Sequence, residues 1–215
     1  MTTWYVIPAR KGSKGLRHKN RKLLSYTLDI IPDHLKKYLI ITTDDEQVIE
    51  ISKGNDIYTV ERRPSLSSDV ADIRSVMEDV IIKRNIEKND TIVMLYLTYP
   101  ERKWKNVINI LEHFKQQKAR SLLCAKDVMT HPYMCIYRDK NRGRQIIKHD
   151  LYRRQDYPDC LEISHFLCIF LASEIKKLNK NMYNKDTNYY KIDEVIDVDQ
   201  QKDLELFQKA GQICD

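Results

Sequence analysis

The sequence predicts an α/β protein with a mostly parallel sheet and helices on both of its faces. Short apolar runs that suit strands alternate with longer stretches in which apolar residues recur at helical spacing. The strand-like runs cover residues 4–7, 39–43, 57–60, 91–97 and 122–125. The helix-like stretches cover residues 23–31, 46–53, 69–84 and 104–117. Because this alternation is typical of consecutive β–α–β units, the strands are expected to pair mainly in parallel.

The alternation ends near Met134, where the pattern becomes irregular. The segments expected after that point are strands at 134–137, 161–171 and 192–198, and helices at 172–180 and 200–211. We find no internal repeat and no linker rich in Pro, Gly or Ser that would divide the chain. The sequence therefore predicts a single domain over residues 1–215, in which residues 134–170 form a smaller insertion.

A basic, glycine-containing loop follows the first expected strand and opens a helix. It begins Ala9-Arg10-Lys11-Gly12-Ser13-Lys14-Gly15, and the first 28 residues hold seven Lys or Arg and no Asp or Glu. Glycines let the backbone approach a ligand closely, and free N–H groups with lysines attract phosphate. The loop matches neither the Walker pattern nor the dinucleotide pattern G-x-G-x-x-G. It predicts a phosphate site, with a solvated basic turn as the alternative.

Charge is unevenly spread along the chain, whose formal net charge is +6. Residues 138–154 are strongly basic, whereas residues 193–215 hold seven acids and only two lysines. A nucleic-acid binder gains little from such an acidic segment, so an anionic small substrate is favoured over nucleic acid. The five cysteines form no C-x-x-C pattern, and no apolar stretch is long enough for a membrane span. We expect a soluble, cytoplasmic protein.

Two acids near the C-terminus are candidate metal ligands. In an extended segment, Asp197 and Asp199 would point to the same side and would both reach one cation. Mg²⁺ prefers oxygen ligands and is commonly held by one or two carboxylates and substrate phosphates. Asp199 also suits the role of a helix N-cap without any metal, so both interpretations remain open.

The loop from Ala9 to Asn20 closely resembles the opening motif A-R-x-G-S-K-G-x-x-x-K-N of the CMP-acylneuraminate synthetases, also called acylneuraminate cytidylyltransferases. Further short motifs of that family follow in the same order along almost the whole chain. They are Ile41-Thr42-Thr43-Asp44, Arg63-Pro64, His131-Pro132, Arg154-Gln155 and Ile196-Asp197-Val198-Asp199.

This resemblance implies a Rossmann-like nucleotidyltransferase fold with a dimerisation extension that reaches a second subunit. It implies a Mg²⁺-dependent enzyme that moves CMP from CTP to a sugar hydroxyl, with a nonulosonic (sialic-type) acid as acceptor and pyrophosphate as product. The nucleotide-binding residues would be Ala9, Arg10, Ser13, Lys14, Asn20 and Arg63. Arg10 and Lys19 would neutralise charge on the leaving pyrophosphate, and Asp197 and Asp199 would hold the metal.

The acceptor half departs from the family pattern. A glutamine that contacts the substrates corresponds to Tyr96, a sugar-facing lysine to Met134, and a carboxylate-binding arginine to Glu162. The acceptor-binding residues of this chain would then be Tyr96, Arg154, Gln155 and Glu162. Three explanations stay open. The arginines of residues 138–154 bind a nonulosonic acid, the enzyme uses another acceptor or nucleotide, or the chain binds nucleotide without turnover.

Overall fold

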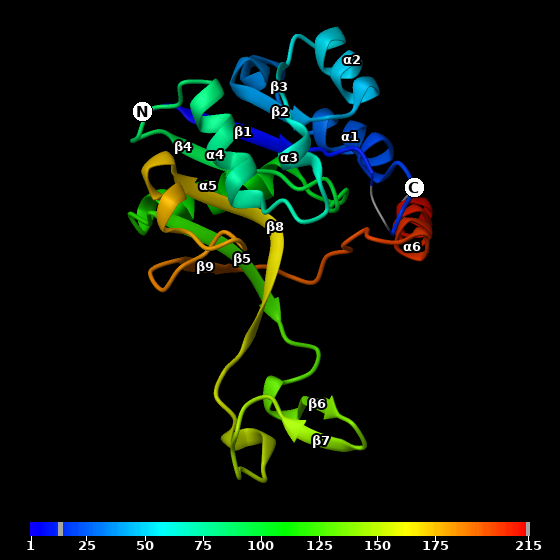
Figure 1. Cartoon of the computed structure of the whole chain (residues 1–215), viewed down its shortest axis with the longest axis vertical. Coiled ribbons are helices and arrows are strands. Elements are labelled where there is room, and N and C mark those ends of the chain that lie inside the picture. Colours follow the sequence, from blue (N-terminus) through cyan, green and yellow to red (C-terminus); the bar gives the residue numbers. More distant parts are fainter. Residues whose placement is uncertain (13–14, 214–215) are drawn as a thin grey trace.

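A seven-stranded sheet with helices on both faces forms the body of the molecule, and a long arm projects from it (Figure 1). The computed structural model describes residues 1–12 and 15–213. The strand order is β3-β2-β1-β4-β8-β5-β9, and all neighbours are parallel except β8, which is antiparallel to β4 and β5. The predicted α/β class with a mostly parallel sheet is therefore confirmed.

The bounds of the elements follow the sequence pattern closely in the first 127 residues. The strands of the large sheet are β1 (Thr3–Pro8), β2 (Leu39–Thr43), β3 (Tyr58–Glu61), β4 (Thr91–Met94), β5 (Ser121–Asp127), β8 (Leu161–Leu171) and β9 (Asn188–Lys191). The α-helices are α1 (Lys19–Asp29), α2 (Glu46–Gly54), α3 (Pro64–Ser67), α4 (Ile73–Lys83), α5 (Trp104–Gln116) and α6 (Gln201–Ile213). Within the described part of the chain, no helix combines the length and apolar character that crossing a membrane requires.

Alternating residues of the central strands supply two separate cores. Val6, Ile40 and Ile92 pack on the face covered by α4, whereas their neighbours Ile7, Ile41 and Val93 pack on the face covered by α1 and α5. Successive side chains of a strand point to opposite faces, so strands buried on both sides read as continuous apolar runs. This is why the short apolar runs of the sequence located the strands correctly.

Two aspartates set where helices begin. The side chain of Asp45 accepts a hydrogen bond from the Gln47 amide at the start of α2, and that of Asp72 accepts one from the Ser75 amide at the start of α4. Capping of this kind satisfies amides that have no partner inside the helix. The helix predicted from residue 69 therefore starts only at Ile73.

The arm consists of residues 128–160, between β5 and β8, together with the outer ends of both strands (Figure 1). It carries the hairpin of β6 (Ile136–Asp139) and β7 (Arg142–Gln145). Its tip has a small core of four aromatic rings, with centroids 4.3–5.5 Å apart; the rings belong to His131, Tyr133, His149 and Tyr157. Residues 168–170, the last three of the predicted insertion 134–170, lie in the large sheet, where they pair with β4.

A bulge of three residues in β8 lies where the arm joins the sheet. Leu123 of β5 lies opposite Cys168, but the next residue, Cys124, lies opposite Ser164, so residues 165–167 are additional. The guanidinium of Arg102, which is only 2% exposed, donates from Nη2 to the carbonyl oxygens of Tyr96 and Phe166 at 2.6 and 2.8 Å. A buried carbonyl needs a donor, and Arg102 supplies one at the bulge and one at the loop after β4.

The strand predicted at 192–198 is wrong, because this segment leaves the sheet after β9 and crosses the ends of the strands (Figure 1). Val198 is fully buried, and its amide donates to the carbonyl of Thr98 at 2.7 Å. The segment also lies directly against Gly15, where an added Cβ would be 2.3 Å from the carbonyl oxygen of Asp199. Residues 196–199, the acidic segment, are thus held beside the loop that follows β1.

Gly15→Ala should weaken this contact, since the new methyl group and the Asp199 carbonyl cannot occupy the same space. We expect a loss of about 1–3 kcal/mol in the free energy of unfolding, measured by urea denaturation. Amide hydrogen exchange should also become faster at residues 196–200. Gly54→Ala is the matched control, because no heavy atom lies within 4 Å of its added Cβ. It should leave stability unchanged or raise it by up to about 1 kcal/mol. Equal behaviour of the two variants would contradict the contact.

Candidate functional site

A cleft of about 220 Å³ opens at the carboxyl ends of β1 and β4. In open α/β sheets, ligands bind outside the carboxyl ends of the strands, so this is where the fold favours a ligand. Its lining combines cations with small and apolar residues, namely Pro8, Arg10, Lys19, Asn20, Arg62, Ala71, Ile73, Val76, Tyr96, Leu97 and Thr98. The cleft therefore has the positive charge and the position that suit a bound polyphosphate.

The loop after β1 is tied down at several points. The side-chain amide of Asn20 donates to the carbonyl of Arg10 at 2.8 Å, and the backbone amide of Lys11 donates to Oδ1 of Asp44 at 2.6 Å. Ala9 is fully buried, and its amide donates to the carbonyl of Thr42 in the neighbouring strand β2. The predicted contacts of Ser13 and Lys14 lie outside the described residues. Of the predicted nucleotide residues, Arg10 and Asn20 line the cleft, and Ala9 supports the loop from beneath.

Arg62 lines the cleft, whereas the predicted Arg63 does not. Nη2 of Arg63 forms an ion pair with Asp79 at 2.9 Å, and the Arg63 side chain is 63% exposed. Nε of Arg62 donates to the Thr42 hydroxyl at 3.2 Å, and burial lowers the Arg62 pKa to about 10, so it stays cationic at neutral pH. The Arg-Pro motif pointed to Arg63, whereas the adjacent Arg62 is the arginine that lines the cleft. Only the direction of each side chain distinguishes them.

The acidic segment meets the basic loop at the end of the cleft. Nζ of Lys19 lies 2.6 Å from Oδ1 of Asp199, and the Tyr99 hydroxyl donates to Oδ2 of Asp197 at 2.9 Å. The Asp199 amide also donates to the carbonyl of Asp197, so this stretch is turned rather than extended. The two carboxylates therefore lie near the cleft, and each has its own partner; the extended conformation expected for this stretch is not observed. Among the described residues, no group of three or more His, Cys, Asp or Glu side chains is arranged for a metal ion.

Tyr96 closes the cleft on the side of β8. Its ring meets the His165 ring edge-on, with the centroids 5.2 Å apart, and burial raises the Tyr96 pKa well above its ordinary value. His165 is the first of the three bulge residues in β8. The sequence singled out Tyr96 as an acceptor residue, but it did not reveal that His165 lies against it, because a bulge cannot be read from a strand-like run.

The other predicted acceptor residues lie outside the cleft. Arg154 and Gln155 belong to a short 3₁₀ turn (Arg154–Asp156) at the far end of the arm (Figure 1). Glu162 is at the base of the arm, where its carboxylate is 3.6 Å from Nζ of Lys126. Met134 also lies in the arm and is 45% exposed. In a single copy of the chain, the structure therefore brings only Tyr96 of the predicted acceptor set to the cleft.

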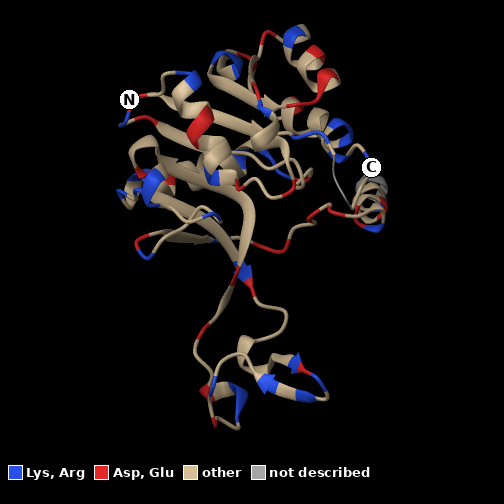
Figure 2. Ribbon diagram, viewed as in Figure 1, with Lys and Arg blue, Asp and Glu red and all other residues tan. Residues whose placement is uncertain are grey.

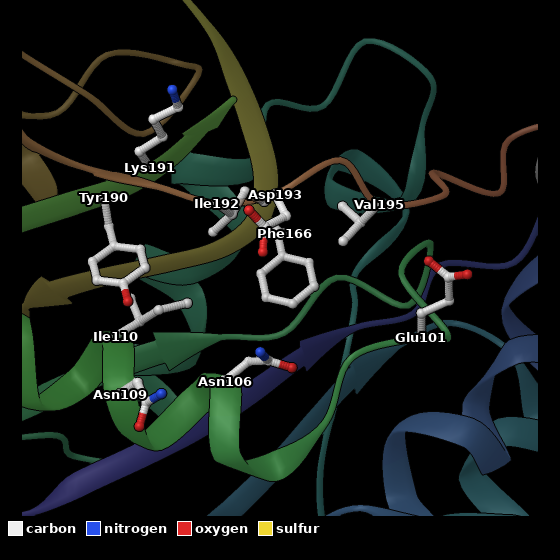
Figure 3. Close-up of a pocket in the computed structure, with 10 residues that line it drawn as sticks. All are labelled: Glu101, Asn106, Asn109, Ile110, Phe166, Tyr190, Lys191, Ile192, Asp193 and Val195. Carbon is white, nitrogen blue, oxygen red and sulfur yellow. The ribbon is translucent and has the colours of Figure 1, made fainter. Parts of the chain in front are cut away.

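A second hollow, of about 280 Å³, lies between α5 and the segment that follows β9 (Figure 3). Its lining includes two acids, Glu101 and Asp193, and the aromatic ring of Phe166. Lys191 points away from the other labelled side chains in Figure 3 and pairs with Asp127 at 2.7 Å. Because no basic group of the described residues points into this hollow, it does not suit a polyphosphate, and the cleft at β1 and β4 is the better candidate for a nucleotide site.

The sequence is similar to several curated enzymes. N-acylneuraminate cytidylyltransferases of Streptococcus agalactiae serotypes III and V are 30% and 31% identical to it over 162 residues, which is 70% of this chain and 39% of each relative. The enzyme of that name from Escherichia coli O18:K1:H7 is 37% identical over 73 residues, 31% of this chain and 17% of the relative. The chain thus spans about two fifths of the streptococcal relatives. No family model matches it.

Solved structures share the fold at low sequence identity. CMP:2-keto-3-deoxy-manno-octonic acid synthetase, in a complex with CTP, superposes with a TM-score of 0.67 at 12% identity and with 99% coverage of both chains. The 4-diphosphocytidyl-2C-methyl-D-erythritol synthase of Anaerococcus prevotii gives a TM-score of 0.62 at 12% identity and 98% coverage of both. The expected nucleotidyltransferase fold is confirmed. Over the matched residues the chain is a relative of the N-acylneuraminate cytidylyltransferases, as the order of its motifs indicated.

Proposed function

We propose that this chain moves CMP from CTP to a hydroxyl of a nonulosonic sugar acid and releases pyrophosphate. The observation that carries the proposal is the meeting of the basic loop and the acidic segment at one cleft, where Lys19 and Asp199 are in contact although 180 positions separate them. The names and sequence similarity of the curated relatives support the choice of CTP and of a nonulosonic acid.

The cations of the cleft would bind the triphosphate and stabilise the charge that develops on pyrophosphate. Arg10, Lys19 and Arg62 all line the cleft, and two of them are held by acids in the free chain. Nη1 of Arg10 is 2.7 Å from Asp69, and Lys19 is paired with Asp199. The sugar oxygen attacks the α-phosphorus while the bond to the β-phosphate oxygen breaks. Positioning and electrostatic stabilisation then supply most of the catalysis.

Asp197 and Asp199 fit a magnesium ion, because Mg²⁺ needs few protein carboxylates when phosphates supply further oxygens. The Tyr99 hydroxyl orients Asp197, which restricts where its carboxylate points. When bound, Mg²⁺ would offset phosphate charge. The ammonium of Lys19 is the cation beside Asp199 in the free chain, and it would turn to the triphosphate when Asp199 has another cation to bind.

A homodimer would account for the arm. Its tip carries many of the chain's Lys and Arg residues (Figure 2), and Arg154 and Gln155 lie too far along it to reach their own cleft. It also exposes large apolar side chains, which is typical of surfaces that contact another protein. These are Met129, Ile136, Tyr137, Ile146 and Tyr152. In this proposal the arm of one copy supplies acceptor-binding residues to the cleft of the other.

The proposed activity can be measured directly. With CTP, Mg²⁺ and N-acetylneuraminic acid, the protein should release pyrophosphate in proportion to the CMP-sugar formed, followed by a coupled phosphate assay and by chromatography. A panel of other nonulosonic acids and other nucleoside triphosphates should give lower rates. Tight CTP binding with no release for any sugar would instead favour a nucleotide-binding role without turnover.

Replacing the two adjacent arginines separately tests the nucleotide site. Arg62→Met should weaken CTP binding by about ten- to one-hundredfold, because hydrogen bonds to a charged group are lost from the cleft. Arg63→Met should have a much smaller effect, since the Arg63 side chain is paired with Asp79 outside the cleft. Calorimetric titration with CTP gives both affinities, and thermal denaturation checks that each variant folds. A larger loss for Arg63→Met would restore the assignment based on the motif.

Metal dependence tests the acidic segment. Mg²⁺ should tighten CTP binding to the wild-type chain, and Asp199→Asn should reduce the apparent Mg²⁺ affinity. We expect a loss of at least about tenfold, because even the removal of a group that only supports a metal ligand commonly costs that much metal affinity. Glu194→Gln is the control, since it removes an exposed carboxylate five residues away that lines a different hollow, together with Lys126 and Lys191. Binding measured by Mg²⁺ titration at fixed CTP needs no turnover. An unchanged Mg²⁺ affinity in Asp199→Asn would rule Asp199 out as a ligand.

A further inference from the structure

The imidazole of His165, which contacts the cleft residue Tyr96, has no hydrogen-bond partner among the described residues. Its ring nitrogens are also absent from the buried polar atoms that lack a partner, so they are not sealed from solvent. A core histidine would normally have its polar atoms satisfied. His165 is therefore available to a ligand.

His165 lies in the bulge of β8, against a residue that lines the cleft and next to a residue that is linked to the acidic segment. On one side, the His165 ring meets the ring of Tyr96, which lines the cleft. On the other side, the hydroxyl of the preceding residue, Ser164, donates to Tyr99 at 3.5 Å, and the Tyr99 hydroxyl donates to Asp197. Two hydrogen bonds thus connect the hydroxyl of Ser164, the residue before His165, to the carboxylate of Asp197.

The position matches that of the sugar in the proposed reaction. Lys19 and Arg10 mark the phosphate side of the cleft, and the attacking hydroxyl must approach the α-phosphorus from the side opposite the leaving pyrophosphate. The lining residues that follow β4, which are Tyr96, Leu97 and Thr98, are uncharged. Burial lowers the His165 pKa, against the opposing effect of Asp197 and Asp199, so the ring is neutral at neutral pH. A neutral imidazole has one donor and one acceptor, which complement a hydroxyl group.

We propose that His165 binds the acceptor, with its imidazole hydrogen-bonded to a hydroxyl of the sugar beside the α-phosphate of the nucleotide. This inference rests on the proposed function and assigns to one side chain of this chain the recognition that Tyr96, Met134 and Glu162 leave incomplete. His165 is an acceptor-binding residue in this role, and it leaves the nucleotide contacts to the loop after β1.

The chain offers a matched control for the test. His113 on α5 meets the Tyr190 ring edge-on with centroids 5.1 Å apart, almost the same ring contact as that of His165 and Tyr96, but away from the cleft. His165→Phe and His113→Phe each keep an aromatic ring against tyrosine and remove the imidazole nitrogens. His165→Gln keeps hydrogen-bonding capacity without the ring.

Initial rates of pyrophosphate release are measured with Mg²⁺ while CTP and N-acetylneuraminic acid are varied in turn. His165→Phe should raise the KM for the sugar by about tenfold, the effect of one lost hydrogen bond, and should leave the KM for CTP within about twofold. His165→Gln should recover part of the loss, and His113→Phe should match the wild type. Should His165→Phe fail to fold, His165→Gln with the same two KM values carries the test.

Three other outcomes would overturn the inference, and they can be told apart. Active wild-type enzyme with an unchanged sugar KM in His165→Phe would remove His165 from the acceptor site and leave the proposed function intact. Wild-type protein that binds CTP but releases no pyrophosphate with any sugar would overturn the proposed function and this inference with it. An equal rise in the KM values for sugar and CTP would show a general disturbance of the cleft and would also overturn it.

Discussion

The docking of the acidic segment across the ends of β1 and β4 is the contact on which the site depends. The Val198 amide is bound by Thr98, the Asp199 carbonyl lies against Gly15, and the Asp199 carboxylate binds Lys19. These contacts join the two ends of the chain, so the loop and the acids face one cleft only in the folded molecule. A contact between residues so distant in sequence carries a large loop-closure cost, which the buried Val198 and the rest of the fold offset.

The bulge in β8 is the second feature that shapes the site. Three additional residues interrupt the pairing with β5. Arg102 donates to the carbonyl of Phe166 in this bulge and to the carbonyl of Tyr96 in the loop after β4. Arg102 forms no ion pair among the described residues; instead the rings of Tyr99 and Phe166 lie 5.9 and 5.1 Å from its guanidinium carbon. Aromatic faces attract a cation and partly compensate for its burial. This buried arginine therefore fixes the backbone on both sides of the Tyr96–His165 contact.

The proposed nucleotide half and the proposed acceptor half of the site differ in how they are built. The nucleotide half is formed by short-range features, a loop after one strand and arginines after another, and its motifs resemble those of the relatives. The acceptor half is formed by Tyr96, a bulge and an arm that extends away from its own cleft (Figure 1).

The sequence by itself determined the α/β class, the first five strands, the phosphate-type loop and the two acids, because each depends on local patterns such as apolar runs, glycines and charge. It did not determine which of Arg62 and Arg63 enters the cleft, where the chain leaves the sheet after Lys191, or that His165 belongs to a bulge. Those features follow from pairing and packing between distant segments. Side-chain direction near a strand end changes with a single residue of register, and only the tertiary structure sets that register.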